Sequence, residues 1–170
     1  MKKTGVGIIG CGNISSTYLE LSKTFTPFEI RAVADINSDA AVAKSWEFGF
    51  EARSVDELLA SKDISIILNL TFPDAHFEVT KNILKADKHA FSEKPLSLSL
   101  IEAQELQSLS SKLGLRVGCA PDTFLGGAHQ KVRQAIDEGQ IGRVITGTCH
   151  IMGHGHESWH PNPDFYYLLG

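Results

Sequence analysis

The feature that most constrains this chain is a glycine turn near its N-terminus, set between an apolar run and a helical pattern. Val6 to Ile9 form a short apolar run that ends in Gly10-Cys11-Gly12. Apolar side chains then recur at roughly helical spacing up to Thr24. This order predicts a strand, a tight turn and a helix, in which backbone N–H groups and the positive helix end bind a dinucleotide pyrophosphate.

The residues of this turn have separate expected roles. Gly10 permits the tight turn, and Gly12 lets the phosphates approach the backbone. Asn13 and Ile14 follow at the helix start, where backbone N–H groups face the pyrophosphate. Ser15 stands where a third glycine usually packs the helix against the strand, and serine is small enough for that place. Because glycine turns also occur without any ligand, a purely structural turn is the alternative interpretation.

An acidic residue follows the second predicted strand, Glu29 to Ala34. Asp35 lies at the distance from the glycine turn at which a carboxylate accepts hydrogen bonds from the adenosine ribose hydroxyls. Its charge would also repel a 2′-phosphate, and Ile36 and Asn37 follow it rather than an arginine. The sequence therefore favours NAD over NADP. The alternative is that Asp35 only caps the turn before the next helix.

Strands and helices continue to alternate up to Pro121. Helix signals include a possible N-cap at Asn37 or Ser38 and capping-box spacings at Ser54-Glu57 and Ser99-Glu102. The expected helices are 39–48, a short one from 54, one with Pro73 in its first turn that runs to about 84, and 99–112. The expected strands are 64–70, which should be buried on both faces, 89–92 and 115–119. This alternation predicts an α/β fold, a doubly wound parallel sheet of Rossmann type with helices on both faces.

The pattern changes after Pro121. Ala128 to Glu138 predicts an amphipathic helix that Gly139 stops, Ile141 to Met152 is strand-like, and a loop rich in Gly, His and Pro follows. One helix and one strand cannot bury a core alone. The sequence therefore predicts a Rossmann domain in residues 1–121 and the incomplete start of a second, α+β domain in residues 122–170. Either the chain is a fragment, or this segment packs against something supplied from elsewhere.

Two further segments follow strands of the predicted sheet, at the edge where open parallel sheets bind ligands. They are Thr71 to His76 and Glu93-Lys94-Pro95. Lys94 would lie near the cofactor, where its ammonium group could orient a substrate hydroxyl and stabilise alkoxide charge that develops during hydride transfer. Judged by itself, a single lysine after a strand is more often solvated surface.

Taken together, these residues resemble the Gfo/Idh/MocA oxidoreductase family. The resemblance is carried by Gly10-Cys11-Gly12, Asp35, Thr71 to His76 and above all Glu93-Lys94-Pro95. Residues 139–144, GQIGRV, are also similar to the family's G-x-I-G-x-V sequence at the start of its C-terminal domain. The resemblance thus covers nearly the whole chain.

The resemblance implies hydride transfer between a nicotinamide cofactor and a secondary alcohol of a sugar, cyclitol or related polyol. Lys94 would be the catalytic lysine, Glu93 would help hold the nicotinamide end, and Pro95 would shape that turn, for which a cis bond is one route. Thr71, with Pro73 and His76, would line the nicotinamide side of the cofactor site.

In the family, an Asp and a His, the latter often the general base, come from a motif beyond Gly170. The resemblance also implies a homo-oligomer at full length.

The alternative from another functional class is a dinucleotide-binding regulator or sensor of the same fold that carries out no reaction. The intact Glu93-Lys94-Pro95 argues against a sensor. NAD-dependent glycoside cleavage is a further activity within the same family, and no motif in this sequence points to it specifically.

Composition narrows the class of partner and the compartment. The net charge is -4 and the chain has no block of like charges, so it lacks the charged patch that binds nucleic acid or an anionic membrane. We therefore expect small molecules as binding partners. Three scattered cysteines fit reduced thiols. Glycines interrupt the first apolar stretch too soon for a signal peptide, and no later run approaches bilayer-spanning length. We therefore expect a soluble cytoplasmic protein.

A histidine-rich segment near the end of the chain is the one candidate for metal binding. It contains His150, His154, His156 and His160 together with Glu157. Imidazole suits zinc, but the segment is full of glycine and proline, and the resemblance implies dehydrogenases that need no metal. We expect no metal site here, with lining of a substrate pocket or a plain loop as the remaining interpretations.

Overall fold

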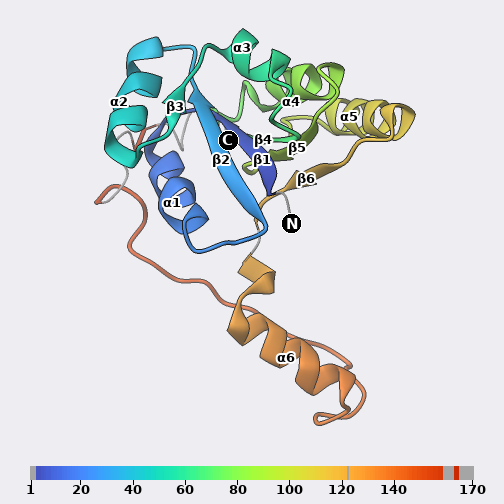
Figure 1. Cartoon of the computed structure of the whole chain (residues 1–170). Helices are drawn as coiled ribbons and strands as arrows, with labels where there is room; N and C mark the ends of the chain where they lie inside the picture. The colour runs from blue at the N-terminus through green and yellow to red at the C-terminus, as the bar shows by residue number, and fades with distance from the viewer. Residues whose placement is uncertain (1–2, 122, 159–162, 165–170) are drawn as a thin grey trace. The chain divides into compact units, whose positions relative to one another are not determined.

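The computed structural model describes residues 3–121, 123–158 and 163–164 (Figure 1). The chain divides into two compact units, Met1–Phe124 and Leu125–Gly170, which are described separately.

The first unit contains a six-stranded sheet in the order β3-β2-β1-β4-β5-β6. Every pair of neighbouring strands is parallel, as predicted. The two-residue strand β3 was not expected, because so short an edge strand carries no periodicity and forms only by pairing with β2. The strands are β1 (Thr4–Ile9), β2 (Phe28–Ala34), β3 (Glu51–Ala52), β4 (Ile66–Asn69), β5 (His89–Ser92) and β6 (Val117–Cys119).

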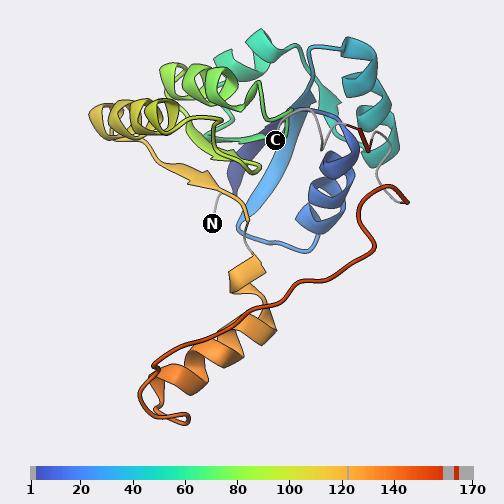
Figure 2. The ribbon, with the colours of Figure 1, turned by 180° about the vertical axis from the view of Figure 1, so that it is seen from behind.

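Helices cover both faces of this sheet, which confirms the predicted fold class (Figures 1 and 2). Helices α1 and α2 lie on one face, and α3, α4 and α5 lie on the other. Their bounds are α1 (Asn13–Ser22), α2 (Ser38–Phe48), α3 (Val55–Ala60), α4 (His76–Lys85) and α5 (Leu100–Leu113).

Side chains that alternate along the strands build one apolar layer on each face. Ile8 of β1 packs in the layer that includes Leu19 of α1, whereas its neighbour Ile9 packs in the layer that includes Leu58 of α3 and Ile83 of α4. Strand β4 contributes to both layers, which confirms that this apolar run is covered on both faces.

Local capping signals account for the helix ends. The Asn37 side chain accepts a hydrogen bond from the N–H of Asp39, and Gly49 ends α2 in the left-handed conformation with φ of 79°. The Ser54-Glu57 capping box is reciprocal. At Ser99 only half of the predicted box forms, because the Glu102 carboxylate accepts from the N–H of Leu98 instead.

The prediction that Pro73 lies in the first turn of a helix was wrong. Helix α4 begins at His76, and Pro73 takes the second position of a turn that the Ala75 N–H closes by donating to the Phe72 carbonyl at 2.9 Å. The fixed φ of proline suits that position as well as it suits a helix start, so the sequence did not separate the two.

The second unit contains the predicted amphipathic helix, α6 (Gly127–Asp137), and Gly139 follows it with φ of 71°. The predicted strand over Ile141 to Met152 does not form in the described residues. A strand needs a hydrogen-bonded partner, and none of the described strands pairs with this segment. Its apolar side chains are open to solvent, with Ile151 96% exposed. Within the described part of the chain, no helix has the length and apolar character to cross a membrane.

Candidate functional site

The strands end at one level, which brings the predicted site residues to a common edge of the sheet. Ile9, at the end of β1, lies beside Ala34 of β2 and Asn69 of β4. Asn69 in turn lies beside Ser92, at the end of β5. The strand order changes direction between β1 and β4, so a ligand crevice is expected outside these carboxyl ends. The segments that leave this edge begin with Gly10, Asp35, Leu70 and Glu93.

The two glycines of the turn have different structural requirements. Gly10 has φ of 104°, and a Cβ atom there would lie 2.5 Å from the carbonyl carbon of Leu70, so only glycine fits. Gly12 has φ of -76°, and a Cβ atom there would meet no atom within 4 Å. Gly10 therefore shapes the turn, whereas Gly12 keeps an open space in front of it.

The start of α1 presents donors to that open space. Asn13 and Ile14 are exposed in its first turn, where backbone N–H groups have no carbonyl partner inside the helix. Ser15 is fully buried, and its hydroxyl donates to the Gly12 carbonyl at 2.6 Å. Serine thus occupies the packing place expected of a third glycine and also braces the turn.

The Asp35 carboxylate joins the end of β2 to the glycine turn. One oxygen accepts a hydrogen bond from the Cys11 N–H at 2.7 Å, and the other accepts from the Asn37 N–H at 2.8 Å. The residue therefore does cap its own turn. A carboxylate accepts about four hydrogen bonds, so ribose hydroxyls still find lone pairs there.

A hollow of about 430 Å³ adjoins Asp35 and is lined by residues that include Ile36, Val42 and Arg53. The Arg53 guanidinium is committed to its neighbours: it donates to both Glu51 oxygens at 3.0 and 2.8 Å and to an Asp63 oxygen at 3.3 Å. These hydrogen bonds, that of Glu51 first, raise the pKa of Arg53 and keep it charged.

A buried polar network shapes the segment after β4. The Asn69 side chain is fully buried, and its oxygen accepts from the Thr71 hydroxyl at 2.6 Å. Its amide group donates to the His76 carbonyl and the Thr80 hydroxyl, both at 3.0 Å. Thr71 is thereby fixed at the edge of the site, and Pro73 lies partly buried in the turn that follows.

His76 lies beneath the site surface rather than on it. Its side chain is 1% exposed, and its ring nitrogens face the carbonyl oxygens of Thr71 and Pro95. The structure thus places the His76 ring between two segments of the candidate site.

The Glu93-Lys94-Pro95 turn leaves β5 beside this network, and its Lys94-Pro95 peptide bond is cis. The Glu93 carboxylate accepts from the Tyr18 hydroxyl of α1 at 2.8 Å and from the Lys94 N–H at 3.1 Å. Lys94 itself is exposed, and no hydrogen bond joins its ammonium group to another residue in the described ranges. The turn is held by its neighbours while the lysine stays accessible.

Sequence reasoning missed three residues that build this site: Tyr18, Asn69 and Arg53. Asn69 carried a signal, because it is the one amide inside an otherwise apolar strand. Tyr18 carried none, since its partner Glu93 lies 75 residues further along the chain. Arg53 carried none that singled out its partners, Glu51 two residues before it and Asp63 ten residues after it.

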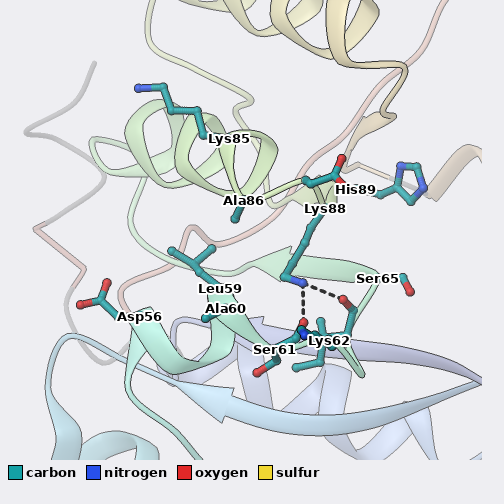
Figure 3. Close-up of a pocket in the computed structure, with 12 residues that line it drawn as sticks. Asp56, Leu59, Ala60, Ser61, Lys62, Ser65, Lys85, Ala86, Lys88 and His89 are labelled. Carbon is teal, nitrogen blue, oxygen red and sulfur yellow. Dashed lines mark hydrogen bonds between the residues drawn. The ribbon is translucent and has the colours of Figure 1, made fainter.

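Another hollow, of about 780 Å³, lies elsewhere and is lined by none of the predicted site residues (Figure 3). There the buried Lys88 ammonium donates to the Ser61 and Ile64 carbonyls at 2.6 and 2.8 Å. Burial lowers the pKa of Lys88, against the opposing charges of Asp63 and Asp87. We interpret Lys88 as a structural link between the start of β5 and the segment after α3.

No three metal-ligating side chains gather anywhere in the described residues. His150, His154 and His156 lie in the described part of the second unit, whereas His160 lies outside it.

The three cysteines, all free thiols, are expected to differ in reactivity. Burial and then the charge of Asp35 raise the pKa of Cys11 to about 11, which leaves roughly one thiol in a thousand ionised at pH 8. Burial also raises the pKa of Cys119, and Cys149 is exposed. Peptide mass spectrometry after timed iodoacetamide treatment should find Cys149 alkylated first and Cys11 last. Equal rates for Cys11 and Cys149 in the folded chain, as expected in urea, would contradict this.

Comparison with known proteins agrees with this geometry. A family model described as "Oxidoreductase family, NAD-binding Rossmann fold" matches residues 4–120. The 1,5-anhydro-D-fructose reductase of Ensifer adhaerens is 29% identical over 82% of this chain and 42% of its own length. The inositol 2-dehydrogenase of Salmonella typhimurium is 30% identical over 82% of this chain and 43% of its own length. The chain thus spans about two fifths of these curated relatives.

Solved structures give the same match. A putative myo-inositol dehydrogenase from Sinorhizobium meliloti is 26% identical with a TM-score of 0.78, over 82% of this chain and 43% of that one. A 3-ketoreductase from Actinomadura kijaniata, in complex with NADP and TDP-benzene, is 28% identical with a TM-score of 0.72, over 81% of this chain and 43% of that one.

Proposed function

Because this chain belongs to the Gfo/Idh/MocA family of oxidoreductases, we propose that it is the nucleotide-binding part of an NAD-dependent dehydrogenase. Its substrate would be a secondary alcohol, or the matching ketone, of a sugar, cyclitol or related polyol. The observation that carries this proposal is the meeting of the glycine turn, Asp35 and the Lys94 turn at one edge of the parallel sheet.

The residues at this edge fit a dinucleotide. The pyrophosphate would lie in front of Gly12 and receive hydrogen bonds from the first turn of α1, which includes Asn13 and Ile14. Asp35 would accept hydrogen bonds from the adenosine ribose. The nicotinamide end would reach the segments that carry Thr71, Pro73, His76 and the Glu93-Lys94-Pro95 turn.

Two features support NAD over NADP. The Asp35 charge would lie beside the ribose 2′ position and repel a phosphate there. Arg53 lines the same hollow, but its charge is already balanced by Glu51 and Asp63, so it offers little to a 2′-phosphate.

Lys94 would act on the substrate hydroxyl. The cofactor supplies the hydride acceptor, and the Lys94 ammonium would orient the hydroxyl and stabilise the charge that develops on its oxygen. A general base must also lie within hydrogen-bonding reach of that hydroxyl. We propose that an Asp and a His from a following domain, which residues 122–170 begin, supply this group in the full-length protein.

The full-length protein would be a cytoplasmic homo-oligomer. Three free thiols, one of them exposed, support a reducing compartment. The second unit has exposed apolar side chains, among them Ile145 and Met152. They support the burial of this surface in the full-length protein, against the following domain or a second copy of the chain.

Calorimetric titration with NAD and with NADP at matched ionic strength tests the cofactor proposal. We expect NAD to bind more tightly. Asp35→Asn keeps an oxygen for the Cys11 N–H but removes the charge, so it should weaken NAD by about tenfold and abolish the preference over NADP. Asp39→Asn, an exposed carboxylate in the first turn of α2, is the matched control and should change neither affinity.

A dinucleotide sensor is the alternative function, and turnover separates the two. The sensor would bind NAD without oxidising any polyol in the full-length protein. Absence of binding by either nucleotide would contradict both functions.

A further inference from the structure

Two backbone carbonyls from different segments converge on one buried side chain. The Nδ1 atom of His76 lies within hydrogen-bonding distance of the Pro95 carbonyl oxygen, and its Nε2 atom lies 3.0 Å from the Thr71 carbonyl oxygen. Thr71 follows β4, and Pro95 follows the neighbouring strand β5. The ring therefore lies between the two segments at the point where they leave the sheet, and as a neutral imidazole it can donate to one of the two carbonyls.

The ring is itself held in place. His76 is the first residue of α4, and its carbonyl accepts a hydrogen bond from the buried Asn69 amide at 3.0 Å. The same amide donates to the Thr80 hydroxyl, one turn further along α4. Because His76 is 1% exposed, water does not compete for its contacts.

The His76 contact with the Pro95 carbonyl lies next to Lys94. On its N-terminal side, Lys94 is anchored through Glu93, whose carboxylate binds the Tyr18 hydroxyl and the Lys94 N–H. On its C-terminal side, the carbonyl of Pro95 is the group that faces His76. The backbone of Lys94 is thus fixed from both sides, by α1 and by α4.

We propose that His76 is a positioning residue: by donating from Nδ1 to the Pro95 carbonyl, it sets the place of Lys94 relative to the cofactor and substrate. The inference rests on the proposed function for its effect on turnover. Its structural part, that the His76 hydrogen bond orders the Lys94 turn, stands on the geometry alone. A carbonyl oxygen only accepts, so the bond requires the N–H at Nδ1. A neutral ring carries one N–H, so Nε2 then lies next to the Thr71 carbonyl oxygen without donating to it.

Three substitutions of His76 test which of its two ring nitrogens orders the Lys94 turn. His76→Asn places an amide N–H near the position of Nδ1, His76→Gln places one near Nε2, and His76→Leu supplies neither. Amide hydrogen exchange should be measured on residues 93–98. We expect exchange there about tenfold faster in the Leu and Gln variants, and within about twofold of the parent in the Asn variant.

The Ile83→Ala variant is the control for a general loss of stability. Ile83 is fully buried on the same helix but packs in an apolar cluster that includes none of the residues of this network. It should speed exchange across α4 without singling out residues 93–98. The proposal is overturned if Ile83→Ala gives the same pattern as His76→Leu, or if Asn rescues no better than Gln.

Turnover in the full-length protein gives the second readout. His76→Leu should lower kcat at least tenfold while the Kd for NAD changes less than threefold, and Asn should recover most of the loss. Equal loss in all three variants, or a loss of NAD affinity alone, would overturn the role in positioning. If the parent protein binds no NAD, the proposed function is wrong. The hydrogen-exchange result still decides whether His76 orders the Lys94 turn.

Discussion

Replacing Gly10 with alanine is expected to destabilise the fold, whereas the same change at Gly12 is expected to remove cofactor binding and leave the fold intact. At Gly10, φ of 104° and a Cβ atom 2.5 Å from Leu70 backbone atoms leave no room for a side chain. The strain should lower the free energy of unfolding by more than about 2 kcal/mol. At Gly12 the added methyl group meets only the space proposed for the pyrophosphate.

Urea unfolding and nucleotide titration of the two variants check this contrast. Gly12→Ala should unfold within about 0.5 kcal/mol of the parent, because its φ of -76° suits alanine, while its Kd for NAD rises at least about a hundredfold. A Gly12→Ala variant that binds NAD as the parent does would refute the proposed place of the pyrophosphate. A Gly10→Ala variant of parental stability would refute the described turn.

Replacing Lys94 with alanine is expected to stop most turnover in the full-length protein. The ammonium group is accessible and lies on a turn that Tyr18 and His76 hold from two helices. If it stabilises charge on the substrate oxygen, its loss should lower kcat by about 10²- to 10³-fold. The Kd for NAD should change less than about threefold, because the glycine turn and Asp35 are untouched.

Initial rates with a panel of polyols, together with NAD titration, measure the two quantities for Lys94→Ala. Lys85→Ala is the matched control, since Lys85 is an exposed lysine that lines the hollow away from the site. The control should keep the parental kcat. Parental turnover in Lys94→Ala would remove that lysine from the mechanism, and a lost NAD affinity with unchanged kcat would assign it to binding alone.

Much of the fold was predictable because its signals are local. Helix α2 shows this best: Asn37 caps its start and Gly49 ends it, as these residue types predict at those positions. The Gly10 turn and the Asp35 carboxylate lie together because β1 and β2 are parallel neighbours whose last residues, Ile9 and Ala34, are paired. The family followed from motifs at this edge, and the match over residues 4–120 confirms it.

The errors occurred where a local signal had two outcomes or needed a distant partner. Pro73 suits a turn and a helix start equally, and the turn formed. The apolar segment from Ile141 to Met152 had the composition of a strand, but no strand in the described residues pairs with it. Strand β3 had no composition to predict it and forms only because β2 offers an edge.

By itself, the sequence determined the order of the longer strands and helices up to Pro121, the glycine turn, the acidic residue beside it and the family, because side-chain size, backbone freedom and periodicity act between near neighbours. Only the tertiary structure decided that Tyr18 binds Glu93, that the His76 ring lies between the Thr71 and Pro95 carbonyls, and that Glu51 and Asp63 balance the Arg53 charge. Two of these contacts, Tyr18–Glu93 and His76–Pro95, join residues 75 and 19 positions apart in sequence. They depend on where packing places a donor and an acceptor, which no local pattern encodes.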